Sequence, residues 1–161
     1  MNQTVGLIGL GNAGAALAHG FSGQRPLLGH DRDAARAGAV ADCELEWARS
    51  PVEVAEKAET VLLSLPHPDA SREVVAALSA AGRPPKIVIE TSTITPKTAR
   101  ELGAMCKEMG AGFVDAAIAG GVQSMAEGKV TFLVGGEAQD FERARPVLEA
   151  VVPIRASMPS A

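Results

Sequence analysis

Six short runs of apolar residues, separated by stretches of helical character, constrain the fold of this chain more than any other feature. The runs are nearly continuous in Val, Ile and Leu, a pattern that is typical of strands covered on both faces, as in a parallel sheet. We expect these strands at 4–9, 26–31, 60–65, 86–91, 113–118 and 129–136. Strand and helix alternating over the whole length predict a doubly wound α/β fold, with helices on both faces of a mostly parallel sheet.

The stretches between the strands carry helix start and stop signals. Ser-Pro-Val-Glu at 50–53 predicts a capping box with proline at the first helical position. The segment 95–110 opens with Thr-Pro and closes with Gly, and another helix is expected within 69–82. Pro146 lies inside an apparent helix over 138–150, so we expect a kink or a split there.

Length and composition indicate one domain with an ordinary hydrophobic core. The 161 residues are 47% hydrophobic and 21% charged, with a formal net charge of -4. A phosphate-backbone surface would need clustered Lys and Arg, so nucleic acid is not expected as a partner. The amino-terminal stretch has no basic region and no long apolar run, which predicts neither a signal peptide nor a membrane span and favours a cytoplasmic protein.

Cysteine and histidine positions predict no metal site. Cys43 and Cys106 form no C-x-x-C pair, and the three histidines are scattered at 19, 30 and 67. Isolated thiols fit a reducing compartment better than a secreted scaffold. Cys106 lies on the apolar face of its expected helix and is predicted to belong to the core.

The first expected strand runs into the spacing G-x-G-x-x-G, followed by an alanine-rich helix. The first glycine would allow a tight turn, the second a close approach of backbone to phosphate, and the third close packing of helix on strand. A dinucleotide pyrophosphate would then lie on the amides and positive dipole of the helix N-terminus, whereas the alternative assigns these glycines to packing alone. The predicted cofactor-binding residues of this Rossmann-type turn are Gly9, Leu10, Gly11, Asn12, Ala13 and Gly14.

The end of the second expected strand carries a candidate ribose-binding acid, Asp31, which lies 20 residues after Gly11. Its carboxylate would accept hydrogen bonds from ribose hydroxyls and repel a 2′-phosphate, which favours NAD. The neighbouring Arg32 offers a partner for that phosphate and leaves NADP as an alternative. We expect NAD.

Beyond this turn, four segments resemble the β-hydroxyacid dehydrogenase family, which includes 3-hydroxyisobutyrate dehydrogenase, tartronate semialdehyde reductase and the N-terminal domain of 6-phosphogluconate dehydrogenase. They are "GLIGLGNAGAALA" (6–18), "LSLPHP" (63–68), "IETSTITPKTARELG" (89–103) and "FVDAAIAGGVQSMAEGKVTFLVGG" (113–136). The resemblance implies a Rossmann-type NAD(P)-binding domain over 1–161. It also implies, for the full-length parent, hydride transfer between nicotinamide and a small 3-hydroxyacid or semialdehyde.

The resemblance further implies roles for residues that follow strand ends. Leu65 and Pro66 would line the cofactor, Thr93 would contact its nicotinamide end, and the amides of Gly120 and Gly121 would hold the substrate. His67 directly follows Leu65-Pro66 and is a further cofactor-contact candidate, although a loop histidine is more often simply solvated. Ala119 and Gln123 complete the predicted substrate-binding set.

Two departures from the family pattern set limits on this expectation. The family has Ser where this chain has Ala119, so a side-chain hydrogen bond to substrate is missing. Family members also continue into an all-helical domain that supplies the catalytic lysine and most of the dimer contacts. None of the five lysines here has that context. We therefore assign no catalytic residue and expect the isolated chain to be inactive, with a stand-alone dinucleotide-binding or sensing module as the alternative.

Overall fold

The computed structural model describes residues 4–120, 124 and 130–151 of the chain. In chain order its elements are β1 (Val5–Ile8), α1 (Asn12–Phe21), β2 (Leu27–His30), the short 3₁₀ helix η1 (Ala34–Val40), β3 (Leu45–Trp47), α2 (Pro51–Lys57), β4 (Thr60–Leu63), α3 (Pro68–Ser79), β5 (Ile87–Glu90), α4 (Pro96–Met109), β6 (Gly112–Ala119), β7 (Thr131–Gly136) and α6 (Ala138–Val151).

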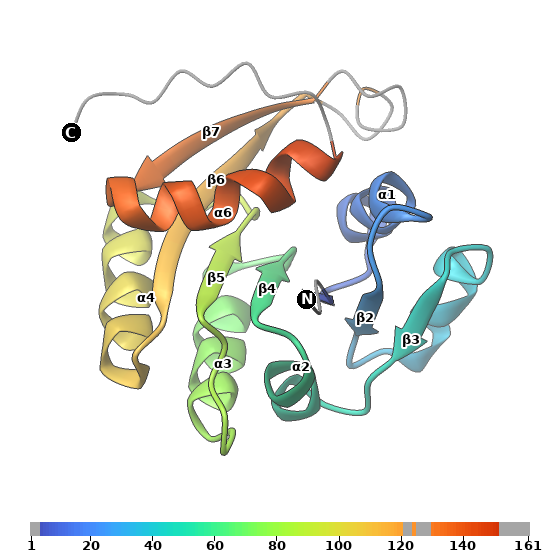
Figure 1. Cartoon of the computed structure of the whole chain (residues 1–161), viewed down its shortest axis with the longest axis horizontal. Helices are drawn as coiled ribbons and strands as arrows, with labels where there is room; N and C mark the ends of the chain where they lie inside the picture. The colour runs from blue at the N-terminus through green and yellow to red at the C-terminus, as the bar shows by residue number, and fades with distance from the viewer. Residues whose placement is uncertain (1–3, 121–123, 125–129, 152–161) are drawn as a thin grey trace.

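The strands form one seven-stranded sheet in the order β3-β2-β1-β4-β5-β6-β7 (Figure 1). All neighbouring pairs from β3 to β6 are parallel, and β7 pairs antiparallel with β6 at the edge. The order 3-2-1-4-5-6 is that of the doubly wound dinucleotide-binding fold, so the predicted fold class is confirmed. The short strand β3 and the antiparallel direction of β7 were not among the sequence-based expectations.

Helices cover both faces of the sheet, as expected. The buried side chains of α1, η1 and α6 pack against one face, and those of α2, α3 and α4 pack against the other. Phe21 and Leu17 of α1 are fully buried in the first core, as are Val75 and Leu102 of α3 and α4 in the second. Cys106 is also fully buried, which confirms its predicted place in the core.

Local capping chemistry fixes the helix ends that the sequence predicted. The Ser50 hydroxyl accepts from the amide of Glu53, and the Glu53 carboxylate accepts in return from the amide of Arg49, one residue before the cap. Helix α4 starts after the Thr95 cap and ends at Gly110, whose φ of 84° is left-handed.

Two expectations for helices need correction. Helix α3 begins at Pro68, because the ring of His67 accepts from the amide of Ala70 and acts as the cap. The expected helix over 138–150 is present as α6, which runs from Ala138 to Val151 with Pro146 inside it, so of the expected kink or split the split is excluded. Phe141 and Leu148 on its buried face anchor the helix to the sheet on both sides of the proline.

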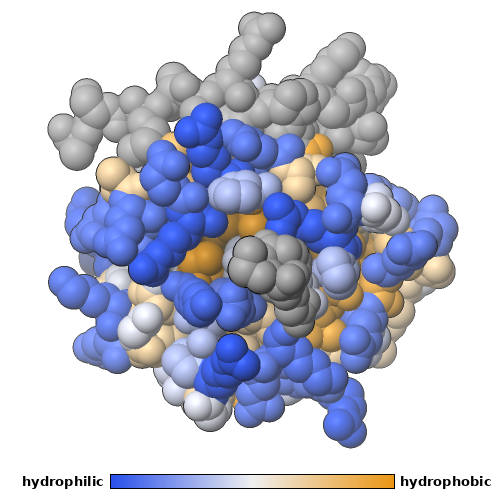
Figure 2. All heavy atoms as spheres, in the orientation of Figure 1, coloured by the Kyte–Doolittle hydropathy of each residue, from blue (hydrophilic) through white to orange (hydrophobic). Residues whose placement is uncertain are grey.

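The surface seen in Figure 2 consists largely of hydrophilic residues, with apolar residues showing between them. Within the described residues, no helix is both long and apolar enough to cross a membrane.

Candidate functional site

The glycine-rich turn between β1 and α1 lies where the strand order reverses, next to the carboxyl end of β4. Gly9 has a φ of 98°, and a Cβ there would collide with the carbonyl oxygen of Ser64. A Cβ on Gly14 would in turn collide with the carbonyl oxygen of Gly9. These two glycines are therefore needed for the close approach of helix, turn and neighbouring strand.

Gly11 differs from both, because a Cβ added there would meet no heavy atom within 4 Å. It is the N-cap of α1 and has no side chain to bond the first helical amides, and the first turn holds no acidic residue. The amides at the start of a helix have no intrahelical acceptor and carry the positive end of the helix dipole. Packing alone does not require glycine at this position, whereas an anion seated on those amides would.

A cavity of about 710 Å³ opens over this helix end. Its lining comes from the ends of β1, β2 and β4 and from one side of α3. The lining residues are Ile8, Gly9, Gly11, Asn12, Ala13, His30, Asp31, Arg32, Asp33, Arg36, Pro51, Ser64, Leu65, Pro66, Ala70, Glu73 and Val74. The cavity thus brings together most of the predicted cofactor-binding residues.

Asp31 is held in place by backbone amides on two loops. Its Oδ2 accepts from the amide of Leu10 at 2.8 Å, and its Oδ1 accepts from the amide of Asp33 at 2.8 Å. The carboxylate therefore ties the glycine turn to the end of β2 and stands fixed at the cavity wall, a role that the sequence did not reveal. Leu10 itself is fully buried and takes part through its backbone.

The two arginines beside this carboxylate differ in their partners. Arg36 lies 3.9 Å from the carboxylate of Asp33. The exposed Arg32 makes no ion pair with any residue that the structure describes. The fixed carboxylate of Asp31 and the guanidinium of Arg32 therefore share this wall of the cavity. The carboxylate favours a ribose hydroxyl, and the guanidinium favours a ribose phosphate.

The family-implied residues after β4 and β5 are only partly brought to the cavity. Leu65 and Pro66 line it, and the Leu65 amide donates to the hydroxyl of Ser92 at 2.8 Å, which joins the two strand ends. His67 does not line the cavity and caps α3 instead, while Thr93 is exposed in the loop after β5 and lies outside the lining.

Two of the predicted substrate-binding residues, Ala119 and Gly120, lie at the carboxyl end of β6. Ala119 is its last residue, and Gly120 follows with a φ of 113° that favours glycine. Ser124 lies beside this turn, its Oγ 3.8 Å from where a Cβ on Gly120 would be. Gly121 and Gln123 lie outside the described residues.

Sequence reasoning missed the contribution of α3 to the cavity. Ala70, Glu73 and Val74 line it together, because spacings of three and four residues place side chains on one face of a helix. That spacing was visible in the sequence, but nothing local indicated which face of this helix meets the cavity.

His30, at the end of β2, also lines the cavity, and its Nδ1 lies 2.9 Å from the carbonyl oxygen of Ala48.

Two acidic residues, Glu90 at the end of β5 and Asp115 in the middle of β6, lie opposite one another in the sheet. Glu90 is fully buried and pairs with Asp115 across the parallel strands. Burial raises the pKa of Asp115 to about 6, and the Glu90 carboxylate adds to this shift. Burial also raises the pKa of Glu90, while Ser71 and Ser92 lower it by less. One oxygen of each carboxyl group is buried without a hydrogen-bond partner among the described residues.

This pair predicts a fall in stability as the pH rises. Because the pKa of Asp115 is higher in the folded chain than the ordinary value of 3.8, the folded chain holds more protons than the unfolded chain between about pH 4 and about pH 6. Stability is then greatest below that window and lower above it. Asp115→Asn should raise the free energy of unfolding by about 1–2 kcal/mol at about pH 8 and change it little at about pH 4, since solvent screens this partly buried group.

Urea unfolding of the wild type and the variant at both pH values measures this effect. Glu108→Gln, which alters an exposed acid on α4, serves as the control and should leave the pH dependence unchanged. An Asp115→Asn variant with the same pH dependence as the wild type would show that the pair is not the source.

Comparison with known proteins relates the chain to one group of dehydrogenases. Residues 4–154 match the family model of the NAD binding domain of 6-phosphogluconate dehydrogenase. The chain is 35% identical to the mitochondrial 3-hydroxyisobutyrate dehydrogenase of Mus musculus, over 91% of this chain and 45% of that protein. A probable 3-hydroxyisobutyrate dehydrogenase of Mycobacterium tuberculosis is 34% identical, over 91% of this chain and 50% of that protein.

Solved structures agree with this relationship. The structure of Mycobacterium tuberculosis 3-hydroxyisobutyrate dehydrogenase with L-serine superposes with a TM-score of 0.89 at 33% identity, over 96% of this chain and 54% of that one. A Streptomyces aurantiacus imine reductase gives 0.83 at 26% identity, over 94% of this chain and 54% of that one. The chain spans about half the length of the relatives that it matches. The predicted resemblance is thereby confirmed, and the chain belongs to the family of NAD-binding domains of 6-phosphogluconate dehydrogenase.

Proposed function

We propose that residues 1–161 form one dinucleotide-binding domain that holds NAD in the cavity over α1. In the full-length parent it would serve an oxidoreductase acting on a small 3-hydroxyacid or its semialdehyde. The observation that carries the binding proposal is the contrast among the three glycines. Gly9 and Gly14 are required by packing, whereas the position of Gly11 is open and faces the cavity. The relatives named 3-hydroxyisobutyrate dehydrogenase support the reaction class.

The chain's own groups fit the two ends of such a cofactor. The free amides at the start of α1 would hold the pyrophosphate, with Asn12 and Ala13 contributing the first of them. The fixed carboxylate of Asp31 retains lone pairs beyond its two amide contacts and would accept from the adenosine ribose hydroxyls. Leu65 and Pro66 would give the cofactor an apolar wall after β4.

NAD, when bound, supplies the hydride acceptor or donor, and the protein supplies orientation and electrostatics. The turn at Gly120 would present its backbone to the substrate, with Thr93 at the nicotinamide end. Ala119 offers only a methyl group, so backbone amides would carry most of the substrate contacts there. The hydroxyl of Ser124 lies beside Gly120 and would offer a side-chain donor at this turn.

Calorimetric titration with NADH tests the binding proposal directly. We expect one NADH per chain and a melting temperature that rises with NADH concentration, because a ligand that binds only the folded chain stabilises it by mass action. Absence of both effects at millimolar NADH would reject the proposal.

Cofactor preference should depend on Asp31. Replacing Asp31 with Ala removes the acceptor for the ribose hydroxyls, and we expect NAD affinity to fall by about 1–3 kcal/mol and the gap to NADP to narrow. Arg32→Ala is the matched variant and should weaken NADP while leaving NAD nearly unchanged. Parallel titrations with both cofactors measure the preference. If the wild type already binds NADP at least about tenfold more tightly than NAD, Arg32 and not Asp31 determines the cofactor preference.

A stand-alone dinucleotide-binding module without turnover is the second candidate. Ala119, in place of a hydroxyl-bearing residue, favours it, because the substrate end of the site then lacks a side-chain contact at this position. The two candidates predict the same NADH binding and differ only in hydride transfer.

A further inference from the structure

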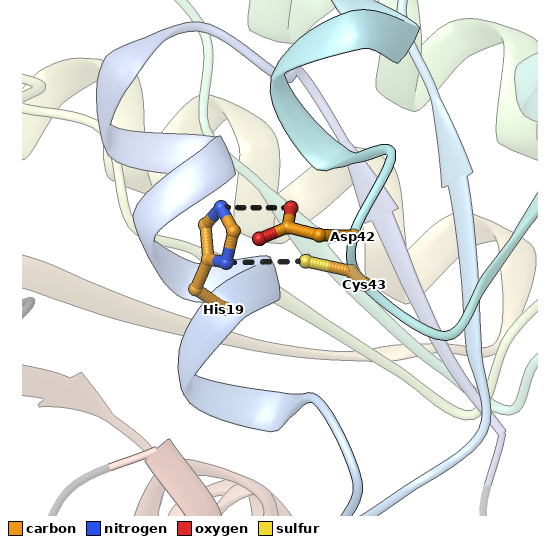
Figure 3. A group of neighbouring side chains, drawn as sticks. All are labelled: His19, Asp42 and Cys43. Atoms are coloured by element: carbon orange, nitrogen blue, oxygen red, sulfur yellow. Dashed lines mark hydrogen bonds and ion pairs between the residues drawn. The ribbon is translucent and has the colours of Figure 1, made fainter.

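Three side chains with metal-binding atoms, one of them distant along the sequence from the other two, lie close together in the structure. His19 lies near the end of α1, and Asp42 and Cys43 lie in the turn between η1 and β3 (Figure 3). His19 Nδ1 is 3.4 Å from Cys43 Sγ, and His19 Nε2 is 3.8 Å from Asp42 Oδ1. One ligand atom from each of the three side chains lies within 4.8 Å of the other two.

This cluster is separate from the NAD cavity. None of its three residues is among the lining residues, and His19 follows Asn12 by seven residues, which is about 10 Å along a helix. Whatever the cluster binds therefore need not compete with the dinucleotide.

The hydrogen bonding of His19 leaves one ring nitrogen available. Nε2 lies 3.2 Å from the carbonyl oxygen of Ala39, and a carbonyl can only accept, so Nε2 carries the proton. Nδ1 then presents its lone pair to the sulfur of Cys43. A histidine whose other ring N–H donates to a backbone carbonyl is the usual arrangement for metal ligands, because the bond fixes the tautomer and the ring orientation.

The donor set selects the class of ion. Nitrogen, sulfur and carboxylate oxygen suit Zn²⁺ and similar transition metals, whereas Ca²⁺ and Mg²⁺ prefer oxygen ligands throughout. Zinc–sulfur and zinc–nitrogen bonds of about 2.3 Å and about 2.0 Å at a tetrahedral angle separate the two ligand atoms by about 3.5 Å. The 3.4 Å between Nδ1 and Sγ agrees with this spacing without any movement of α1 or the turn.

We propose that His19 Nδ1, Cys43 Sγ and an Asp42 carboxylate oxygen form a three-ligand site for Zn²⁺, with solvent completing the coordination. The Asp42 side chain is 78% exposed, so it can turn from Nε2 toward the ion. Cys43 is buried, and its sulfur already lies 3.4 Å from His19 Nδ1. The ion would fasten the end of α1 to the turn before β3 and so stabilise this edge of the sheet.

Binding exchanges a proton for the ion. Because Nε2 carries the ring proton, Nδ1 can only accept, so in the free chain the Cys43 thiol donates toward it. Coordination forms the zinc–sulfur bond as the S–H bond breaks, and the proton passes to solvent. One proton should therefore appear in a weakly buffered solution for each ion bound.

Co²⁺ as a spectroscopic substitute for Zn²⁺ tests the proposal on the full chain, with a phosphine reductant to keep the thiols free. We expect one ion per chain with a Kd below about 10 µM, and a sulfur-to-cobalt charge-transfer band that Zn²⁺ abolishes by displacement. Cys43→Ser should remove the band, and His19→Gln should weaken binding at least about tenfold. Cys106→Ala changes the other cysteine and should leave the band in place.

Two results would overturn the site: no binding up to about 100 µM, or a band that survives Cys43→Ser. NADH titration of the same Cys43→Ser and His19→Gln variants separates this proposal from the first one, since their NADH affinity should match the wild type. A zinc site that fails while NADH still binds leaves the dinucleotide proposal untouched.

Discussion

Gly11→Val is expected to abolish NADH binding while leaving the chain folded. The Cβ at this position meets nothing within 4 Å, so the fold has room for the side chain. That room is the space over the first amides of α1 that the pyrophosphate needs, because Gly11 lines the cavity. We expect affinity to fall at least about 100-fold, while the free energy of unfolding without ligand changes by less than about 1 kcal/mol.

Gly14→Ala provides the matched contrast. Its Cβ would enter the backbone carbonyl of Gly9, which is not the end of a flexible side chain and cannot move aside. We expect this smaller substitution to lower the free energy of unfolding by about 2–4 kcal/mol. Urea unfolding and NADH calorimetry on both variants distinguish the two roles. A Gly11→Val chain that binds NADH within threefold of the wild type would falsify the proposal that the pyrophosphate lies on the first amides of α1.

Elements set by local chemistry were predictable from the sequence. The start of α2 at Pro51 and both ends of α4 follow from a cap residue, a proline and a glycine within a few positions. Buried parallel strands were equally visible, because both of their faces must be apolar. These features need no knowledge of distant residues.

Elements set by long-range pairing were not predictable. Strand β3 has three residues, one of them the exposed Glu46, and exists through its pairing with β2. The antiparallel direction of β7 depends on the return of the chain beside β6, which no local pattern encodes. The continuity of α6 through Pro146 likewise follows from its packing against the sheet.

The candidate site likewise combines features that local sequence predicts with features that only tertiary contacts create. The glycine turn and Asp31 were proposed as cofactor contacts from their spacing, because the phosphate and ribose ends of a dinucleotide demand those residue types. The amide contacts that fix Asp31, the wall from α3 and the meeting of His19 with Cys43 are products of tertiary structure. The sequence predicted no metal site because the candidate ligands are separated along the chain and adjoin only after α1 and η1 pack.

We expect the 161-residue chain to have no measurable dehydrogenase activity. With saturating NAD or NADH, it should transfer no hydride from small 3-hydroxyacids or to their semialdehydes. The reaction needs a group that exchanges a proton with the substrate oxygen, and a positioned proton transfer contributes about 10²- to 10⁴-fold in rate. Among the described residues, His67 caps α3 with its ring, while Lys57 and Lys86 pair with acids at the amino ends of the strands, away from the cavity.

Absorbance of NADH in the presence of the substrates measures this activity, and supplying a helical domain of the same family with its lysine should raise the rate by at least about 100-fold. Replacing that lysine should return the rate to the level of the chain alone, while NADH affinity stays unchanged. Lys97→Ala is the internal control, since Lys97 is exposed in the first turn of α4, which follows the carboxyl end of β5. Turnover by the chain alone that disappears in Lys97→Ala or His67→Ala would place the proton-transfer group within this domain. The proposal that this domain only binds the cofactor, while the helical domain supplies the proton-transfer group, would then be wrong.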